Sequence, residues 1–177
     1  MEKRSESKSS KKKLSWKLNS REKMLAIVVL AALLAGAWLP GRLTISTSPS
    51  LDHRIFFLTR AKGSITTGDY LVFRHKDTRF VQKGLDQQND RLVKKVGCCP
   101  GDMLSVDSKR TFFCCRKELG TALQTDSKGR SLPVFDFTGV VPENSYFMVG
   151  TNPRSFDSRY FGFIHADEIL YKALPIC

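Results

Sequence analysis

The chain has 177 residues, of which 41% are hydrophobic and 26% are charged, and its formal net charge is +12. This length suits one domain of roughly 100–150 residues with an appendage. A basic chain can bind nucleic acid, but here the excess charge lies at one end, beside an apolar segment, which favours a membrane. We therefore expect no nucleic-acid partner.

The first predicted element is a basic tail over residues 1–23. It holds nine Lys/Arg and three Glu, a net charge of +6 and half the excess of the whole chain. Lysine-rich flanks of apolar segments stay in the cytoplasm, so we expect a cytoplasmic tail. The rival use of this tail, binding nucleic acid, is disfavoured because Trp16 is its only aromatic residue.

An apolar segment of sixteen residues without a charge, Met24 to Leu39, comes next and is followed by Pro40. Crossing a bilayer takes about 20 residues, with a usual range of about 17–25, so the segment is short. Lys23 can snorkel and Trp38 can sit at the interface. We expect a transmembrane helix over residues 24–40, anchoring the chain once in the lipid of the inner (cytoplasmic) membrane.

This anchor places residues 41–177 outside the cytoplasm, in the periplasm of a Gram-negative host. Two other interpretations of the apolar segment stay open. The triplet ending at Ala37 resembles a signal-peptide cleavage site, and the segment could also be a buried helix of a soluble protein.

The rest of the chain has the texture of short strands separated by turns, after a tether over residues 41–50. The predicted strands cover residues 54–58, 70–74, 91–96, 103–106, 111–113, 134–137, 145–149 and 163–164. Residues 107–110 form the turn of a hairpin, and residues 76–90 form a polar loop. Many short strands with frequent turns predict a mainly β fold, an antiparallel barrel-like domain behind one N-terminal helix.

Five cysteines stand at positions 98, 99, 114, 115 and 177. The inner four allow three pairings, between which the sequence does not choose. One disulfide between the two vicinal pairs would close a loop of about 16 residues and contribute ~3 kcal/mol; free buried thiols are the alternative. Neighbouring strand residues face opposite ways, so a zinc site is disfavoured and no metal or cofactor is expected.

A nucleophilic hydroxyl needs a neighbouring base. His53, His75 and His165 stand outside the motifs of hydrolases and metalloproteases and read as surface or loop residues. A neutral lysine can replace histidine if burial lowers its pKa from about 10.4. Lys94 shares its strand face with Leu92 and Val96, so it is favoured over Lys95 as the buried base, although two solvated lysines remain an alternative.

Four blocks in order resemble the type I signal peptidase family (serine–lysine, S26 type), and most closely its conjugative-transfer, TraF-like, pilin-maturation branch. The blocks are Ser50-Leu51, residues 68–73 (GDYLVF), Lys94-Lys95-Val96 with residues 100–102 (PGD), and residues 155–162 (SFDSRYFG). The resemblance implies a membrane-anchored signal-peptidase domain over residues 41–177. The sequence departs from the family pattern at Leu51, Lys95, Pro153 and Cys98-Cys99.

By this resemblance Ser50 is the nucleophile and Lys94 the general base of a serine endopeptidase. The backbone N–H of Ser50 and the hydroxyl of Ser48 would form the oxyanion hole, since Pro49 has no N–H. Ser155 would orient the lysine amine. Asp157 and Arg159 would form a supporting ion pair.

The implied substrate is the signal-peptide segment of an exported precursor, extended beside a strand edge, with Ala-like residues one and three positions before the cut. A conjugative pilin is one such precursor, and some relatives also cyclise it. Conjugation machinery is then a further partner. The departures leave an alternative open: a catalytically inactive, membrane-anchored assembly factor of a secretion or conjugation apparatus.

Overall fold

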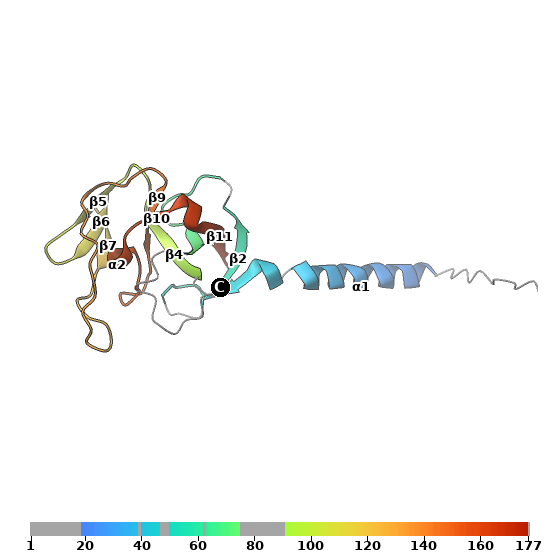
Figure 1. Cartoon of the computed structure of the whole chain (residues 1–177). Helices are drawn as coiled ribbons and strands as arrows, with labels where there is room; N and C mark the ends of the chain where they lie inside the picture. Colours follow the sequence, from blue (N-terminus) through green and yellow to red (C-terminus); the bar gives the residue numbers. More distant parts are fainter. Residues whose placement is uncertain (1–18, 39, 47–49, 62, 75–90, 177) are drawn as a thin grey trace, which may run out of the picture. The chain divides into compact units, whose positions relative to one another are not determined.

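The structure, a computed structural model, describes residues 19–38, 40–46, 50–61, 63–74 and 91–176. Its internal contacts divide the chain into two units, Met1–Gly41 and Arg42–Cys177. The first unit contains helix α1 and the start of a short 3-10 helix, η1 (Pro40–Arg42). The second contains all the strands (Figure 1).

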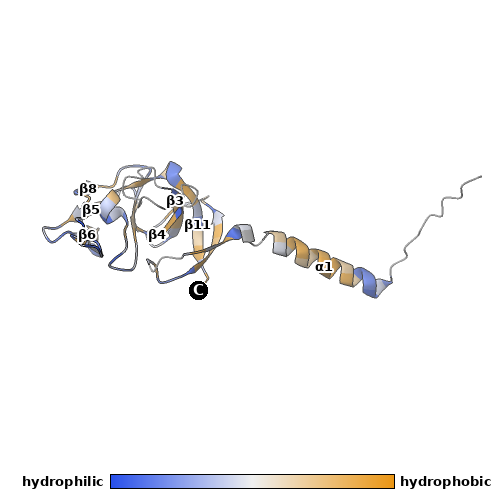
Figure 2. Ribbon diagram, turned by 60° about the horizontal axis from the view of Figure 1, so that its bottom comes forward, coloured by the Kyte–Doolittle hydropathy of each residue, from blue (hydrophilic) through white to orange (hydrophobic). Residues whose placement is uncertain are grey.

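Helix α1 (Ser20–Trp38) contains most of the apolar segment, and its side chains are apolar after a charged first turn (Figure 2). Arg21, Glu22 and Lys23 shorten its uncharged run. In the part of the chain that the structure describes, no helix is both long enough and apolar enough to cross a membrane. The transmembrane helix predicted over residues 24–40 is thus not found among the described helices by this criterion.

The larger sheet of the second unit has seven antiparallel strands in the order β1-β2-β11-β3-β4-β9-β10. Its strands are β1 (Leu43–Ile45), β2 (Ile55–Arg60), β3 (Tyr70–Arg74), β4 (Arg91–Cys98), β9 (Ser145–Val149), β10 (Ile164–His165) and β11 (Ile169–Pro175). Strand β3 is buried on both faces: Leu71 and Phe73 join one apolar cluster, and Tyr70 and Val72 join another. Alternation along a strand thus builds a core on each side of the sheet.

The smaller sheet has four strands in the order β7-β6-β5-β8. They are β5 (Met103–Val106), β6 (Thr111–Cys114), β7 (Lys117–Thr121) and β8 (Gly139–Val140), and β5 to β7 lie side by side in Figure 1. Phe112 and Leu104 are fully buried in its core, and Phe112 stacks on Phe147 of β9, which joins the two sheets. Among the described strands neither sheet closes on itself, so two antiparallel sheets replace the predicted barrel-like domain.

Most predicted strands are confirmed to within a few residues, as is the turn over residues 107–110, where Arg110 N–H bonds to the carbonyl of Asp107. The strand predicted over residues 134–137 is wrong. Phe135 and Phe137 instead pack their rings on Phe163, and this segment joins neither sheet. Strands β1, β7, β8 and β11 were not predicted, and β1 lies within the expected tether. The predicted loop over residues 76–90 lies outside the described residues.

Candidate active site

Lys94 is the buried lysine of strand β4, with 4% of its surface exposed. It shares a face with Val96 and stands opposite Leu71 of β3, both fully buried apolar residues. This burial lowers the pKa of Lys94 to about 8, while the Asp157 carboxylate raises it and the Arg159 guanidinium lowers it. At pH 7 an amine with this pKa is neutral in about one molecule in ten, compared with about one in 2,500 for an ordinary lysine with a pKa of about 10.4.

Lys95 faces the other way. It is half-buried, and its ammonium lies 5.9 Å from the ring centroid of Tyr70. The structure therefore confirms that Lys94, and not Lys95, is the lysine placed in an apolar surrounding. The physical reason is the alternation of a strand, which sends adjacent side chains to opposite faces.

Lys94 donates a hydrogen bond from Nζ to Oγ of Ser155, at 2.7 Å. Ser155 is itself buried and follows a turn in which its N–H bonds to the carbonyl of Asn152, at 2.9 Å. The predicted pairing of Ser155 with the lysine amine is present. This short hydrogen bond to the Ser155 hydroxyl fixes the direction in which the lysine amine points.

Gly150 allows the backbone of Ser50 to lie close to the side chain of Ser155. A Cβ added at Gly150 would collide with the side chain of Ser155 and would lie 2.8 Å from the carbonyl oxygen of Ser50. Only a residue without a side chain leaves room for both serines here. The backbone of Ser50 and the Lys94–Ser155 pair therefore border the same small region.

Asp157 and Arg159 form a bidentate ion pair that is almost completely buried, at 0% and 1% exposure. Arg159 Nε and Nη2 each lie 2.8 Å from a carboxylate oxygen of Asp157. Asp157 also accepts the N–H of Gly150 and caps the short helix α2 (Ser158–Phe161). Arg159 donates further to the carbonyls of Ser155 and Thr121. The pair thus holds the segment that carries Ser155.

Ser48, which was predicted to lie in the site, and the histidines, which were expected to lie on the surface or in loops, have different outcomes. Ser48 and Pro49 lie outside the described residues, as does His75. His53 is half-buried and packs edge-on against Tyr70, with ring centroids 5.9 Å apart. His165 is exposed, and its Nδ1 lies 3.2 Å from Oγ of Ser145. Both described histidines therefore have structural contacts away from the Lys94–Ser155 pair.

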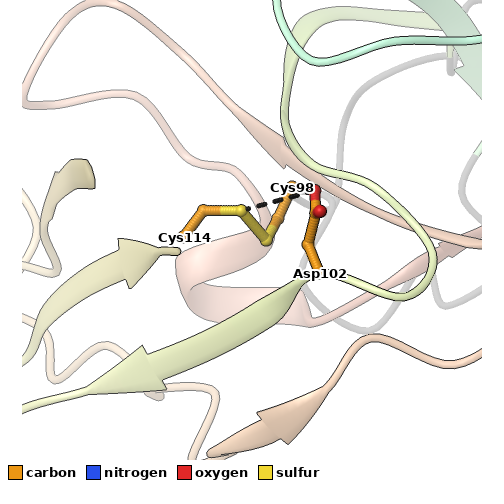
Figure 3. A group of neighbouring side chains, drawn as sticks. All are labelled: Cys98, Asp102 and Cys114. Carbon is orange, nitrogen blue, oxygen red and sulfur yellow. Dashed lines mark hydrogen bonds between the residues drawn. A yellow bond between two sulfur atoms is a disulfide. The ribbon is translucent and has the colours of Figure 1, made fainter. Parts of the chain in front are cut away.

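Among the described residues, Cys98 and Cys114 form a disulfide, with Cα atoms 5.6 Å apart and a sequence separation of 16. It is one of the cross-pair links that the sequence left open. The carboxylate of Asp102 lies 3.7 Å from Sγ of Cys114 (Figure 3). These three residues have the spacing of a metal site, but sulfurs bonded to each other cannot serve as thiolate ligands. Cys99 and Cys115 are free thiols.

The model of one protein family, "Signal peptidase, peptidase S26", matches residues 18–176. The chain belongs to this family. The match covers all of the described residues, including the Lys94 strand and the loop that carries Ser155. The family resemblance noted in the four sequence blocks is thereby confirmed.

Two relatives of this S26 family member are both named "Conjugal transfer protein TraF". The one from Agrobacterium fabrum (strain C58 / ATCC 33970) is 33% identical over 85 residues, 48% of either chain. The one from Agrobacterium tumefaciens (strain 15955) is 26% identical over 161 residues, 85% of this chain and 90% of the relative. Of the solved structures, a signal peptidase I from Enterococcus faecalis V583 matches 60% of this chain and 94% of its own, with 24% identity and a TM-score of 0.36.

The residues that the sequence analysis missed lie just before Ser155, in the loop of residues 150–152. Gly150 provides the room between Ser50 and Ser155, and the N–H groups of Thr151 and Asn152 bond to the carbonyl of Ser50, at 2.9 and 3.3 Å. An available signal was the Gly-x-Asn-Pro run itself, because Gly and Asn-Pro mark tight turns. Backbone contacts of this kind leave no other mark in a sequence.

Proposed function

We propose that this S26 family member is a serine endopeptidase in which Ser50 is the nucleophile and Lys94 the general base. The observation that carries the proposal is the Lys94 amine: it is buried, its pKa is lowered to about 8, and Ser155 orients it beside the backbone of Ser50. A catalytic base works best when its pKa lies near the working pH. A solvated surface lysine would be neither buried nor lowered in its pKa.

In the proposed reaction, neutral Lys94 takes the proton of the Ser50 hydroxyl as the oxygen attacks a peptide carbonyl. The protonated lysine then gives a proton to the leaving amine, and the acyl group stays on Ser50 until water, or an amine in a cyclisation, releases it. Ser155 orients the amine throughout. The oxyanion donors, the Ser50 N–H and the Ser48 hydroxyl, rest on the family resemblance.

The strand β4 offers an edge for an extended substrate. It pairs with β3 over residues 91–95, but β9 pairs only with Lys95, Val96 and Cys98. On the side of β9, no described strand pairs with residues 91–94, the part of β4 that ends at Lys94. A peptide strand added there would bring its backbone alongside the base. This supports an extended segment of an exported precursor as substrate.

The names of the two TraF relatives support conjugal transfer as the setting. A pilin as the candidate precursor rests on the family resemblance of the sequence blocks. The Cys98–Cys114 disulfide supports an oxidising compartment outside the cytoplasm for residues 41–177. Cleavage of a precursor on this side of the membrane is consistent with both observations. The mass of the product distinguishes release of the acyl group by water from release by an amine.

The test is cleavage of an internally quenched peptide, with Ala one and three positions before the cut, by the full chain. Lys94→Ala should lower kcat/KM by about 10²–10⁴-fold, and Ser50→Ala by at least as much. Lys95→Ala is the matched control, since its side chain faces away, and should retain activity within a few-fold. A serine-directed acylating probe should label the wild type at Ser50 and leave Lys94→Ala unlabelled.

Normal cleavage by Ser50→Ala would overturn the proposal. A folded wild-type chain that neither cleaves nor takes the probe would favour the inactive assembly factor instead. Mass spectrometry of the product then separates the two outcomes of the acyl-enzyme, since hydrolysis adds one water and cyclisation adds none.

A further inference from the structure

The carbonyl oxygen of Ser50 is held by an unusual number of donors from one short loop. The N–H of Thr151 bonds to it at 2.9 Å, the N–H of Asn152 at 3.3 Å, and the hydroxyl of Thr151 at 3.4 Å. A carbonyl has two lone pairs and is usually satisfied by one or two donors. Three donors from adjacent residues fix the orientation of the Ser50 peptide group.

The same loop also delivers Ser155 to the lysine. Asn152 opens a turn with Pro153 at its second position: the Asn152 carbonyl accepts the N–H of Ser155, and its Oδ1 accepts the N–H of Arg154. Proline presets the backbone for this position of a turn, and an Asn side chain closes it. Residues 150–155 therefore contact Ser50 at one end and orient the Lys94 amine at the other.

We propose that this loop is a two-point clamp that sets Ser50 and Lys94 in register, and that Thr151 is its positioning residue for Ser50. The proposal rests on the proposed function, and it adds a residue that the four motif blocks do not contain. Thr151 acts through the backbone of Ser50 and touches no reacting atom. Holding this peptide plane fixes the position of the Ser50 Cα, from which Cβ and the hydroxyl extend, and a misplacement of about 1 Å can cost 10²-fold in rate.

Thr151 suits a clean substitution because its side chain is exposed and fills no core space. Thr151→Val keeps the shape and removes the hydroxyl, whereas Thr151→Ser keeps the hydroxyl. The Thr151 N–H survives in both. Replacing residue 151 by the α-hydroxy acid analogue of threonine turns that amide into an ester and removes the N–H bond to Ser50 as well.

The experiment measures kcat and KM of the full chain on the quenched Ala-x-Ala peptide. We expect Thr151→Val to lower kcat roughly two- to tenfold, Thr151→Ser to restore it, and the ester to lower it further, each with KM within about twofold. The pH midpoint of kcat/KM should stay in place, because Lys94 keeps its surroundings. Thr125→Val, an exposed threonine elsewhere, is the control and should behave as wild type.

Unchanged kcat in both Thr151→Val and the ester, with Ser50→Ala inactive, would overturn the clamp and leave the proposed function standing. A loss that follows the folded fraction, or that Thr151→Ser does not restore, would also overturn it, because a merely structural role predicts that pattern. Cleavage by Ser50→Ala would instead remove the proposed function itself. The two failures are therefore distinguishable.

Discussion

The two sheets of this protein differ in the charge that is buried beside them. Next to the seven-stranded sheet, which also packs two apolar clusters, the interior holds Lys94, Asp157 and Arg159, each at most 4% exposed. The core of the four-stranded sheet consists of aromatic and aliphatic side chains, and the Cys98–Cys114 disulfide links it to β4 of the larger sheet. Desolvated charge is costly, whereas apolar burial and a crosslink stabilise. Under the proposed function, the larger sheet would carry the chemistry, and the smaller sheet with its crosslink would contribute mainly stability.

The two regions are physically connected, so the stability of one can support the other. Arg159 donates from Nη1 to the carbonyl of Thr121, the last residue of β7, at 3.0 Å. Gly97 of β4 is enclosed between Val149 and Leu119, and a Cβ there would lie 3.1–3.2 Å from their side chains. Three predictions test this division, beginning with the largest effect.

Breaking the buried ion pair should have the largest effect. Arg159→Leu leaves the Asp157 carboxylate buried without its partner, which typically costs 3–5 kcal/mol. We expect that loss in the free energy of unfolding of the full chain, measured by chemical denaturation. Arg154→Leu is the control, because Arg154 is exposed on the same loop and surface changes usually stay within about 0.5 kcal/mol.

If the two arginine variants were equally stable, the buried pair would not hold the loop, and the contrast between the sheets would lose its basis. Arg159→Lys sharpens the result. It keeps the positive charge but cannot reproduce the two-point contact with the carboxylate, so its stability should lie between those of the wild type and Arg159→Leu.

The contrast also shows what the sequence could supply. Alternation along β4, a local pattern, predicted which lysine is buried, and the family resemblance of the motif blocks implied that Ser155 meets it. Strand β11 was missed although it pairs with both β2 and β3. Its place in the sheet depends on partners that lie about 100 residues upstream. The segment 134–137 had strand-like composition, but its rings found an aromatic cluster and no neighbouring strand.

The loop before Ser155 illustrates the same limit within the site. Its contacts to Ser50 use backbone N–H groups, which every residue except proline possesses, so the residue type carries little information. The disulfide could be predicted only in part. The sequence spacing allowed a link between the vicinal pairs, but the choice of Cys98 and Cys114 depends on which residues of β4 and β6 face each other in the fold.

Removing the disulfide should have the next largest effect. A crosslink that closes a loop of about 16 residues contributes ~3 kcal/mol, so Cys98→Ala/Cys114→Ala should lower the free energy of unfolding by about that amount. Cys115→Ala is the control, as Cys115 is an exposed free thiol. The folded double variant should still cleave peptide at close to the wild-type rate. A large loss of kcat in folded protein would show that the smaller sheet also shapes the site.

The pH dependence is the smallest of the three effects. It tests most directly whether the larger sheet sets the surroundings of Lys94. In the proposed function the neutral form of Lys94 is the base, and burial lowers its pKa to about 8. Below that pH each unit of acidification lowers the neutral fraction tenfold, about 1.4 kcal/mol. We therefore expect kcat/KM to rise with a slope of one up to about pH 8 and then level off. The double cysteine variant should keep this midpoint, because the larger sheet buries Lys94. A midpoint near 10.4, the ordinary lysine value, would mean that the working amine is solvated, and the larger sheet would then no longer be the source of the chemistry.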